Sequence, residues 1–281
     1  MRWQDSRRSS NVEDYRGSRF GGAGLKLGVG GTLIALVAAY FLGIDPSMIL
    51  GLSESLPSGP APEGREGVPQ DEQGQFISAV LGETEDTWGA IFQAHGAQYD
   101  PPRLVLFTDQ VQSGCGFASA AVGPFYCPAD HKVYLDLGFY DQLSTRFGAP
   151  GDFAQAYVLA HEVGHHVQTL LGTEDKVRAA QSRASELQKN QLQVRMELQA
   201  DCYAGVWAHN ADSARHILEQ GDVEEALGAA SAVGDDTLQK RTQGHVVPDS
   251  FTHGTSQQRM GWFKRGLDSG RLENCDTFSG M

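Results

Sequence analysis

The stretch that most restricts the fold of this chain is AYVLAHEVGHHVQTLLG, residues 156–172, an apolar run that also contains three histidines and one glutamate. Its apolar residues recur at the spacing of a buried helix. Burying an imidazole or a carboxylate without a partner costs free energy. The run therefore predicts a buried helix whose polar groups are satisfied by a metal ion and by a second element that faces it.

His161, Glu162 and His165 form an H-E-x-x-H motif within this run. Residues four apart lie on one face of a helix, so both imidazoles can reach one zinc ion at about 2.0–2.1 Å. Glu162 points about 100° away, where it can hold a zinc-bound water without binding the metal. We therefore predict His161 and His165 as ligands of one Zn²⁺ per chain and Glu162 as a catalytic residue. His166 faces away from both ligands and is interpreted as a surface or hydrogen-bonded histidine.

A catalytic zinc site needs a third protein ligand and one open position. Gln168 and Leu171 stand where the metzincin continuation would have Gly and His, so that pattern fails. Another apolar helical run, QVRMELQADCYAGVWAH, carries Glu197 and, one turn later, Asp201. We predict Glu197 as the third ligand and Asp201 as the acceptor for a ligating histidine. Asp175 is a rival ligand, but its position favours a charge at a helix start.

An uncharged apolar segment lies near the N-terminus. Residues 27–44, LGVGGTLIALVAAYFLGI, follow a set of basic residues: Arg2, Arg7, Arg8, Arg16, Arg19 and Lys26. Such a run is able to cross a hydrocarbon core of roughly 30 Å, and the basic excess predicts a cytoplasmic N-terminal side. We expect a cytoplasmic basic tail over residues 1–26 and a single-pass anchor over residues 27–44 in the inner membrane. A cleaved signal peptide is the alternative, although no clear cleavage site precedes Asp45.

The remaining chain divides into a linker and a folded domain. Residues 45–75 are crowded with Pro, Gly, Ser and Glu and are expected to form a flexible linker. The domain, on the extracytoplasmic (periplasmic) side, is then expected over residues 76–281. Its first helix is predicted over residues 76–97, and two strands are predicted at RLVLFTDQV and HKVYLDL, the latter as an edge strand. Helices are then predicted over residues 139–147, 153–171, 173–189, 191–209, 223–240 and 256–268. This order is typical of an α+β fold with a small sheet and mainly helices.

Four cysteines, Cys115, Cys127, Cys202 and Cys275, all follow the expected anchor, as an oxidising compartment permits. Cys115 and Cys127 are candidates to close a Gly-rich loop and the other two to pair, but four cysteines allow three pairings. The loop is either a lid over a cleft or a stapled surface loop. The net charge of −13, without a basic stripe, argues against nucleic acid as a partner.

Several uncommon strings occur in order: LIALVAAYFLGID, GCGFASAAVGPFYCPADHKVYLDLGFY, HEVGHHVQ and ELQADCYAGVWAH. Over most of its length the chain thus resembles the bacterial family of predicted neutral zinc metallopeptidases with one N-terminal membrane anchor. The resemblance implies a zincin-like metalloprotease domain.

A further string, FTHGTSQQRMGWFKRG, is similar to the T-H-P-x-x-x-x-R stretch of membrane-linked gluzincin proteases, with Gly254 in place of Pro. It implies that His253 lies near the zinc and stabilises the oxyanion, and that Arg259 orients the carboxylates of the metal helices. The alternative is a histidine at a helix start and a surface arginine.

These features predict a membrane-anchored zinc endopeptidase that acts on peptides or unfolded protein. Glu162 would take a proton from the zinc-bound water and give it to the leaving amine. The substrate would lie as an added strand against HKVYLDL. The alternatives are a non-catalytic envelope scaffold or binding module with a structural zinc, and a metal hydrolase with a non-protein substrate. A structural site has four ligands and does not need Glu162.

Overall fold

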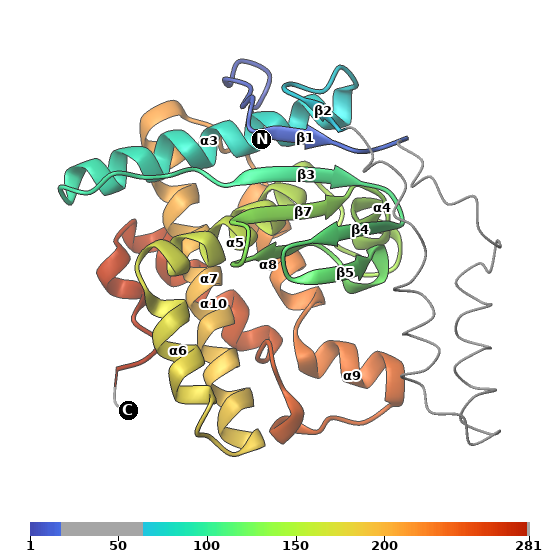
Figure 1. Ribbon diagram of the computed structural model, residues 1–281, viewed down its shortest axis with the longest axis vertical. Coiled ribbons are helices and arrows are strands. Elements are labelled where there is room, and N and C mark those ends of the chain that lie inside the picture. Colours follow the sequence, from blue (N-terminus) through green and yellow to red (C-terminus); the bar gives the residue numbers. More distant parts are fainter. Residues whose placement is uncertain (18–63, 280–281) are drawn as a thin grey trace. The chain divides into compact units, whose positions relative to one another are not determined.

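A computed structural model describes residues 1–17 and 64–279. Met1–Arg16 and Arg65–Met281 form one compact unit, and a second unit, Gly17–Gly64, lies almost wholly outside the described residues. The described residues contain eight α-helices and a small mixed sheet, so the predicted α+β class is confirmed. The helices in Figure 1 are α3 (Glu72–Ala94), α4 (Gly138–Thr145), α5 (Asp152–Leu170), α6 (Thr173–Gln181), α7 (Glu186–Arg215), α8 (Asp222–Ala232), α9 (Asp235–Gln243) and α10 (Ser256–Ser269).

The main sheet has five strands in the order β2-β1-β3-β7-β6. They are β1 (Val12–Asp14), β2 (Arg65–Glu66), β3 (Arg103–Phe107), β6 (Phe125–Cys127) and β7 (Lys132–Asp136). β3 pairs in parallel with β1 and β7, whereas β2 and β6 add antiparallel edges. The expectation that HKVYLDL is an edge strand is therefore wrong, because β6 covers it. β6 has only three residues, too few for its period to show in the sequence.

Alternate residues of β3 and β7 enter two different hydrophobic cores, as the period of a strand requires. One face packs on the helices through Leu104, Leu106, Val133 and Leu135. The other face carries Val105, Phe107 and Tyr134 and packs against a separate hairpin. That hairpin consists of β4 (Gln110–Ser113) and β5 (Gly116–Ser119). The sheet is thus buried on both faces, and the helices lie on one of them.

The N-terminal residues belong to this folded unit, which differs from the expected tail over residues 1–26. Val12 in β1 is 1% exposed, and Ser78 of α3 donates to the carbonyl of Ser9. Asp14 of β1 lies opposite Arg65 of β2, so the chain leaves and re-enters the sheet at neighbouring positions. The expected domain start at residue 76 is also wrong. β1 and β2 are short and polar, and their pairing with distant β3 leaves no local sequence signal.

The predicted membrane span over residues 27–44 lies outside the described residues. Within the part of the chain that is described, no helix combines the length and the apolar character that a membrane crossing requires.

Two predicted helices are each split in two. Residues 173–189 divide between α6 and α7, because Ser185 begins α7 with a capping box. Residues 223–240 divide at Gly234, where a Cβ atom would lie 2.4 Å from the backbone nitrogen of Ser256. The start of α10 therefore passes too close for any side chain at position 234, and α8 ends there.

Both suggested disulfides are present, Cys115–Cys127 and Cys202–Cys275. Cys202 and Cys275 are fully buried and join α7 to the C-terminal segment. Cys115 is exposed, and its bridge joins the turn of the β4–β5 hairpin to β6. One bridge therefore lies inside the helical core, and the other holds a surface loop.

Candidate metal centre and cleft

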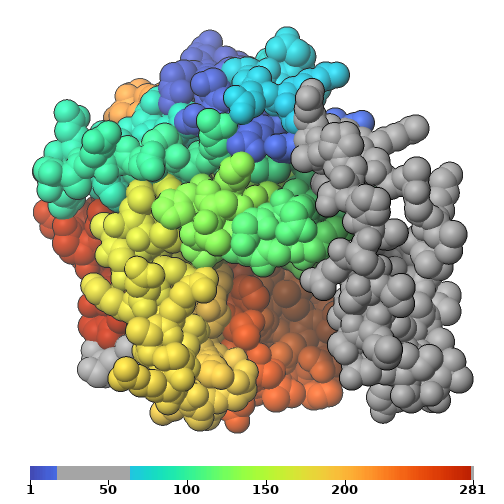
Figure 2. Space-filling model, in the orientation of Figure 1, coloured from blue at the N-terminus to red at the C-terminus, as the bar shows by residue number. Residues whose placement is uncertain are grey.

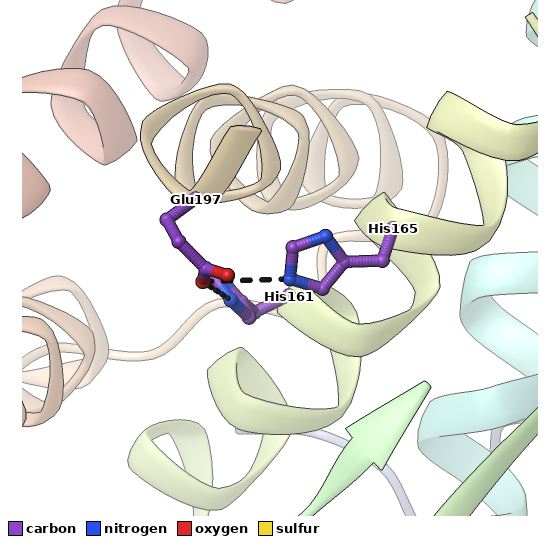
Figure 3. Close-up of side chains that lie close together, drawn as sticks. All are labelled: His161, His165 and Glu197. Carbon is purple, nitrogen blue, oxygen red and sulfur yellow. Dashed lines mark hydrogen bonds and ion pairs between the residues drawn. The ribbon is translucent and has the colours of Figure 1, made fainter. Parts of the chain in front are cut away.

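The structure brings together the three predicted metal ligands (Figure 3). His161 and His165 extend from α5, and Glu197 reaches them from α7. The Nε2 atoms of His161 and His165 lie 3.1 Å and 3.5 Å from Oε2 of Glu197. Close helix packing permits this approach, since a Cβ at Gly164 would lie only 3.0 Å from the carbonyl oxygen of Ala200.

These atoms fit the ligand set of a tetrahedral ion. Zinc bonds near 2.0–2.1 Å place neighbouring ligand atoms about 3.3 Å apart, close to the separations of both histidines from Glu197. The other ring nitrogens are already bonded: Nδ1 of His161 lies 2.8 Å from Oδ1 of Asp201, and Nδ1 of His165 lies 2.9 Å from Oε1 of Gln168. Because both acceptors require a protonated Nδ1, each Nε2 is free to bind a metal.

Asp175 and Gln168 differ in their burial and in their contacts with the candidate ligands. Asp175 is exposed in the first turn of α6 and is not part of the metal-binding group, so Glu197 is the better candidate. Gln168 was not predicted to act here. It is fully buried, and its amide also donates to the carbonyl of Met196. The signal was a polar residue in the apolar run, three residues after His165.

A buried network holds His161 from behind. Asp201 is fully buried, and its Oδ1 accepts from Nδ1 of His161, the hydroxyl of Tyr157 and Nη2 of Arg259. Arg259, on α10, also donates through Nε to Oδ2 of Asp201 at 2.9 Å. Arg259 is 4% exposed, so it is not the surface arginine of the alternative interpretation. α10 is therefore fixed to α7 through a two-point ion pair.

The electrostatics of the site follow from this burial. Burial raises the pKa of Glu162 above its ordinary value. Burial would also raise the pKa of Glu197, but His165 and His161 hold it well below its usual range. Asp201 is likewise buried, yet Arg259 and His161 keep its pKa at about 2. Glu197 and Asp201 are therefore carboxylates, ready to act as ligand and acceptor.

His253 lies in the same cleft, ahead of α10. Its Nδ1 is 3.5 Å from Oδ1 of Asp235, and its backbone N–H donates to Oδ2 of that residue. Asp235 also accepts from the backbone N–H groups of Thr252 and Gly254 and thereby fixes the loop. Contact with Asp235 raises the pKa of His253, and Glu197 adds to the effect. Asp235 was not predicted from the sequence, because it lies 18 residues away on α9.

The metal group opens into a cleft of about 600 Å³ between two walls. The helix wall carries the three ligands, Glu162 and His253 on α5, α7 and the loop before α10. The strand wall consists of residues 120–128, which include the short helix η1 (Ala120–Val122) and β6. In Figure 2 the green surface of the β4–β5 region borders yellow residues of α6 and orange residues near α9. The loop closed by Cys115 and Cys127 is therefore a wall of the cleft.

His166 lies on the far side of α5 from the metal group. It is 1% exposed and hydrogen-bonded. Of the two interpretations from the sequence, a surface histidine or a hydrogen-bonded one, the second is therefore correct. Burial lowers its pKa to about 4, so the ring is neutral near pH 7.

Comparison with known proteins agrees with this arrangement. Residues 1–278 match the family described as "Putative neutral zinc metallopeptidase", and the chain belongs to that family. It is 52% identical to the uncharacterized protein YpfJ of Escherichia coli, over 99% of each chain. It is 39% identical to the uncharacterized protein Rv2575 of Mycobacterium tuberculosis, over 86% of this chain and 85% of that one. No solved structure matches the chain.

Proposed function

We propose that this protein is a zinc-dependent endopeptidase. The observation that carries the proposal is the convergence of His161, His165 and Glu197 beside the buried Glu162 in an open cleft. The three ligands leave a coordination position open, as catalytic zinc sites do. The family description supports the same activity. When bound, the zinc ion would supply Lewis acidity that polarises the substrate carbonyl and lowers the pKa of water.

The protein groups then have separate tasks. Glu162 accepts the proton of the attacking water and passes it to the leaving amine, a role that its raised pKa favours. His253, protonated beside Asp235, donates a hydrogen bond to the oxyanion that forms at the carbonyl. Asp201 and Arg259 keep His161 in the tautomer that presents Nε2.

We propose that the substrate pairs with the free edge of β6. This strand borders the cleft, and an unpaired edge offers backbone groups that bind an extended peptide of any sequence. β6 replaces HKVYLDL as the strand proposed to pair with the substrate, because HKVYLDL lies inside the sheet as β7. An extended backbone is available only in peptides and unfolded or flexible segments, so these are the proposed substrates.

The two ends of the cleft differ in character. Near α4 and α9 the cleft is lined by the apolar residues Phe139, Phe147, Val158 and Leu238, with Gln142 and Arg146 among them. The other end carries the polar residues Glu174, Arg178 and Gln193. We propose that the apolar end takes a large apolar side chain next to the cleaved bond. Mass spectrometry of the products tests this, with cuts beside Leu, Phe and Met expected and an even distribution of cut sites contradicting it.

We further propose attachment to the inner membrane through residues 27–44, with the cleft on the extracytoplasmic side. Two disulfides support that side, because such bonds persist in oxidising compartments. The pairing of β1 with β2 and β3 argues for Met1–Arg16 on the same side as the cleft. We therefore propose, in place of a cytoplasmic tail and a single crossing, that the segment enters and leaves the membrane on that one side. Recovery of the chain in the soluble fraction of lysed cells would contradict the attachment.

The decisive experiment compares the full chain with Glu162→Gln. Zinc content and hydrolysis of an unfolded protein are measured, and Glu174→Gln, on α6 in the same cleft, serves as the matched control. We expect about one zinc per chain in all three proteins, and a loss of at least about 10²-fold in kcat only for Glu162→Gln.

Other outcomes select other functions. If all three proteins hold zinc and none cleaves protein, ester or cell-wall substrates, the non-catalytic scaffold or binding module is the better account. Cleavage of a non-protein substrate alone would identify a different metal hydrolase. A wild-type chain that binds no zinc would contradict the ligand assignment itself.

A further inference from the structure

His166 has a fixed tautomer that determines the direction of its hydrogen bonds. Its Nε2 lies 2.7 Å from the carbonyl oxygen of Asp100, and its Nδ1 lies 3.1 Å from the hydroxyl of Tyr126. A carbonyl oxygen only accepts, so Nε2 carries the proton of the neutral ring. Nδ1 is then an acceptor, and the hydroxyl of Tyr126 donates to it. One imidazole thus links α5 to β6 and to the loop before β3.

The imidazole is also held by rings on several sides. The ring centroids of Tyr99, Tyr126 and His131 lie 5.4–5.9 Å from that of His166, all in edge-to-face arrangement. Edge-to-face contacts fix ring orientation as well as burying area. His166 is therefore a rigid point on the back of the metal helix.

Tyr126 is the residue of β6 that faces this point. Its neighbour Phe125 stacks on Tyr134 at 4.8 Å in the second core, and Cys127 is buried in that core too. Tyr126 packs instead against the core that contains α5. β6 is a three-residue edge strand, and Tyr126 is the residue through which it contacts His166 on α5.

We propose that the hydrogen bond from Tyr126 to His166 sets the distance between β6 and the metal ligands, which makes His166 a positioning residue for extended peptides. His166 and His165 are adjacent on one helix, so a strand fixed to His166 is also fixed relative to the metal centre. The proposal rests on the proposed endopeptidase function, because it concerns the peptide that pairs with β6.

The test is Tyr126→Phe, which removes one hydroxyl and keeps the ring. Tyr99→Phe is the matched control, since its ring packs edge-to-face on the same imidazole and its hydroxyl has no hydrogen-bond partner among the described residues. For a peptide long enough to pair with β6, we expect Tyr126→Phe to raise KM roughly 3- to 10-fold at nearly constant kcat. A blocked dipeptide, too short to pair with β6, and the Tyr99→Phe protein should show no change.

The position of the imidazole is tested by His166→Gln and His166→Leu. Gln keeps a donor and an acceptor and should restore much of the peptide affinity that Leu loses. Equal changes in KM for long and short substrates, or the same change in Tyr99→Phe, would show a merely structural role and overturn the proposal.

A binding assay separates this proposal from the proposed function. A labelled extended peptide is titrated into full-length Glu162→Gln, with and without Tyr126→Phe. A Kd raised roughly 3- to 10-fold by Tyr126→Phe supports the positioning role even if the wild-type chain cleaves nothing. An unchanged Kd, or no peptide binding at all, overturns it.

Discussion

The helix wall of the cleft and its strand wall are held in place by opposite means. The helix wall depends on buried charge, with Asp201 fully buried and Arg259 4% exposed. The strand wall is short and open to solvent, and Val122 at its rim is 64% exposed. A buried charge pair tolerates little displacement, because each partner loses its opposite charge when the other moves. The helix wall is therefore fixed by buried charge, whereas the strand wall is fixed at Tyr126 and at the Cys115–Cys127 bridge and has an exposed rim at Val122.

Breaking the helix wall should have the largest effect. Arg259→Met leaves Asp201 as a buried carboxylate with only His161 and Tyr157 beside it, and should lower the free energy of unfolding by about 3–5 kcal/mol. Arg265→Met, an exposed position on the same helix, is the control and should change it by less than about 0.5 kcal/mol. Urea unfolding of both proteins measures the difference. Similar values for the two variants would mean that the buried pair is not what holds this wall.

The two disulfides allow a direct comparison of the walls. Cys202 and Cys275 lie 73 residues apart and are buried, so replacing both by Ala should cost about 2–5 kcal/mol. Cys115 and Cys127 lie 12 residues apart, and their replacement should cost less, because a shorter loop restricts the unfolded chain less. The KM for a peptide substrate should rise only in the variant that lacks Cys115 and Cys127. If replacing Cys115 and Cys127 lowered the free energy of unfolding more than replacing Cys202 and Cys275, the expected order of the two walls would be contradicted.

The smallest effect is expected at an exposed ion pair on the far side of the sheet. The hydrogen bond from Arg16 lowers the pKa of Asp71 to about 2. Burial acts in the opposite direction, with a smaller effect. Because the folded pKa lies below the unfolded value of about 3.9, the pair contributes stability above that pH and loses it as pH falls toward 2. Asp71→Asn keeps a good N-cap for α3 and removes only the charge.

With Asp71 half exposed, the loss in Asp71→Asn at pH 7 should be under about 1 kcal/mol. The difference in Tm between the two proteins should shrink in 1 M salt and between pH 4 and pH 3. A difference that stays constant across this range would show that the ion pair is not its source.

The sequence indicates which side chains the candidate metal group brings together, because the relevant signals are local. His161, Glu162 and His165 lie within one turn of one helix, and Glu197 and Asp201 lie within one turn of another. Their polar character in apolar runs identifies them before any contact is known. Asp235 gives no such signal, since it sits in a polar helix start and acts on a loop 18 residues later.

The sheet is less predictable for a related reason. β3 and β7 are apolar and five residues long, so their pattern is visible. β1, β2 and β6 have two or three residues each and are stabilised by partners far away in the chain. The break between α8 and α9 lies at Gly234, where Ser256 comes too close for a side chain. This contact joins residues far apart in the chain, so no local sequence pattern predicts it.

The pairing of Asp14 with Arg65 brings the two ends of the intervening segment to neighbouring positions in the sheet. An apolar segment near an N-terminus is usually removed for expression together with all that precedes it. Here that cut would delete β1 and open the apolar edge of β3 to other chains. A short Gly-Ser connection between residues 16 and 65 would remove the same segment and keep the edge closed. For protein engineering, the first sixteen residues therefore have to be kept, because they belong to the same folded unit as residues 65–281.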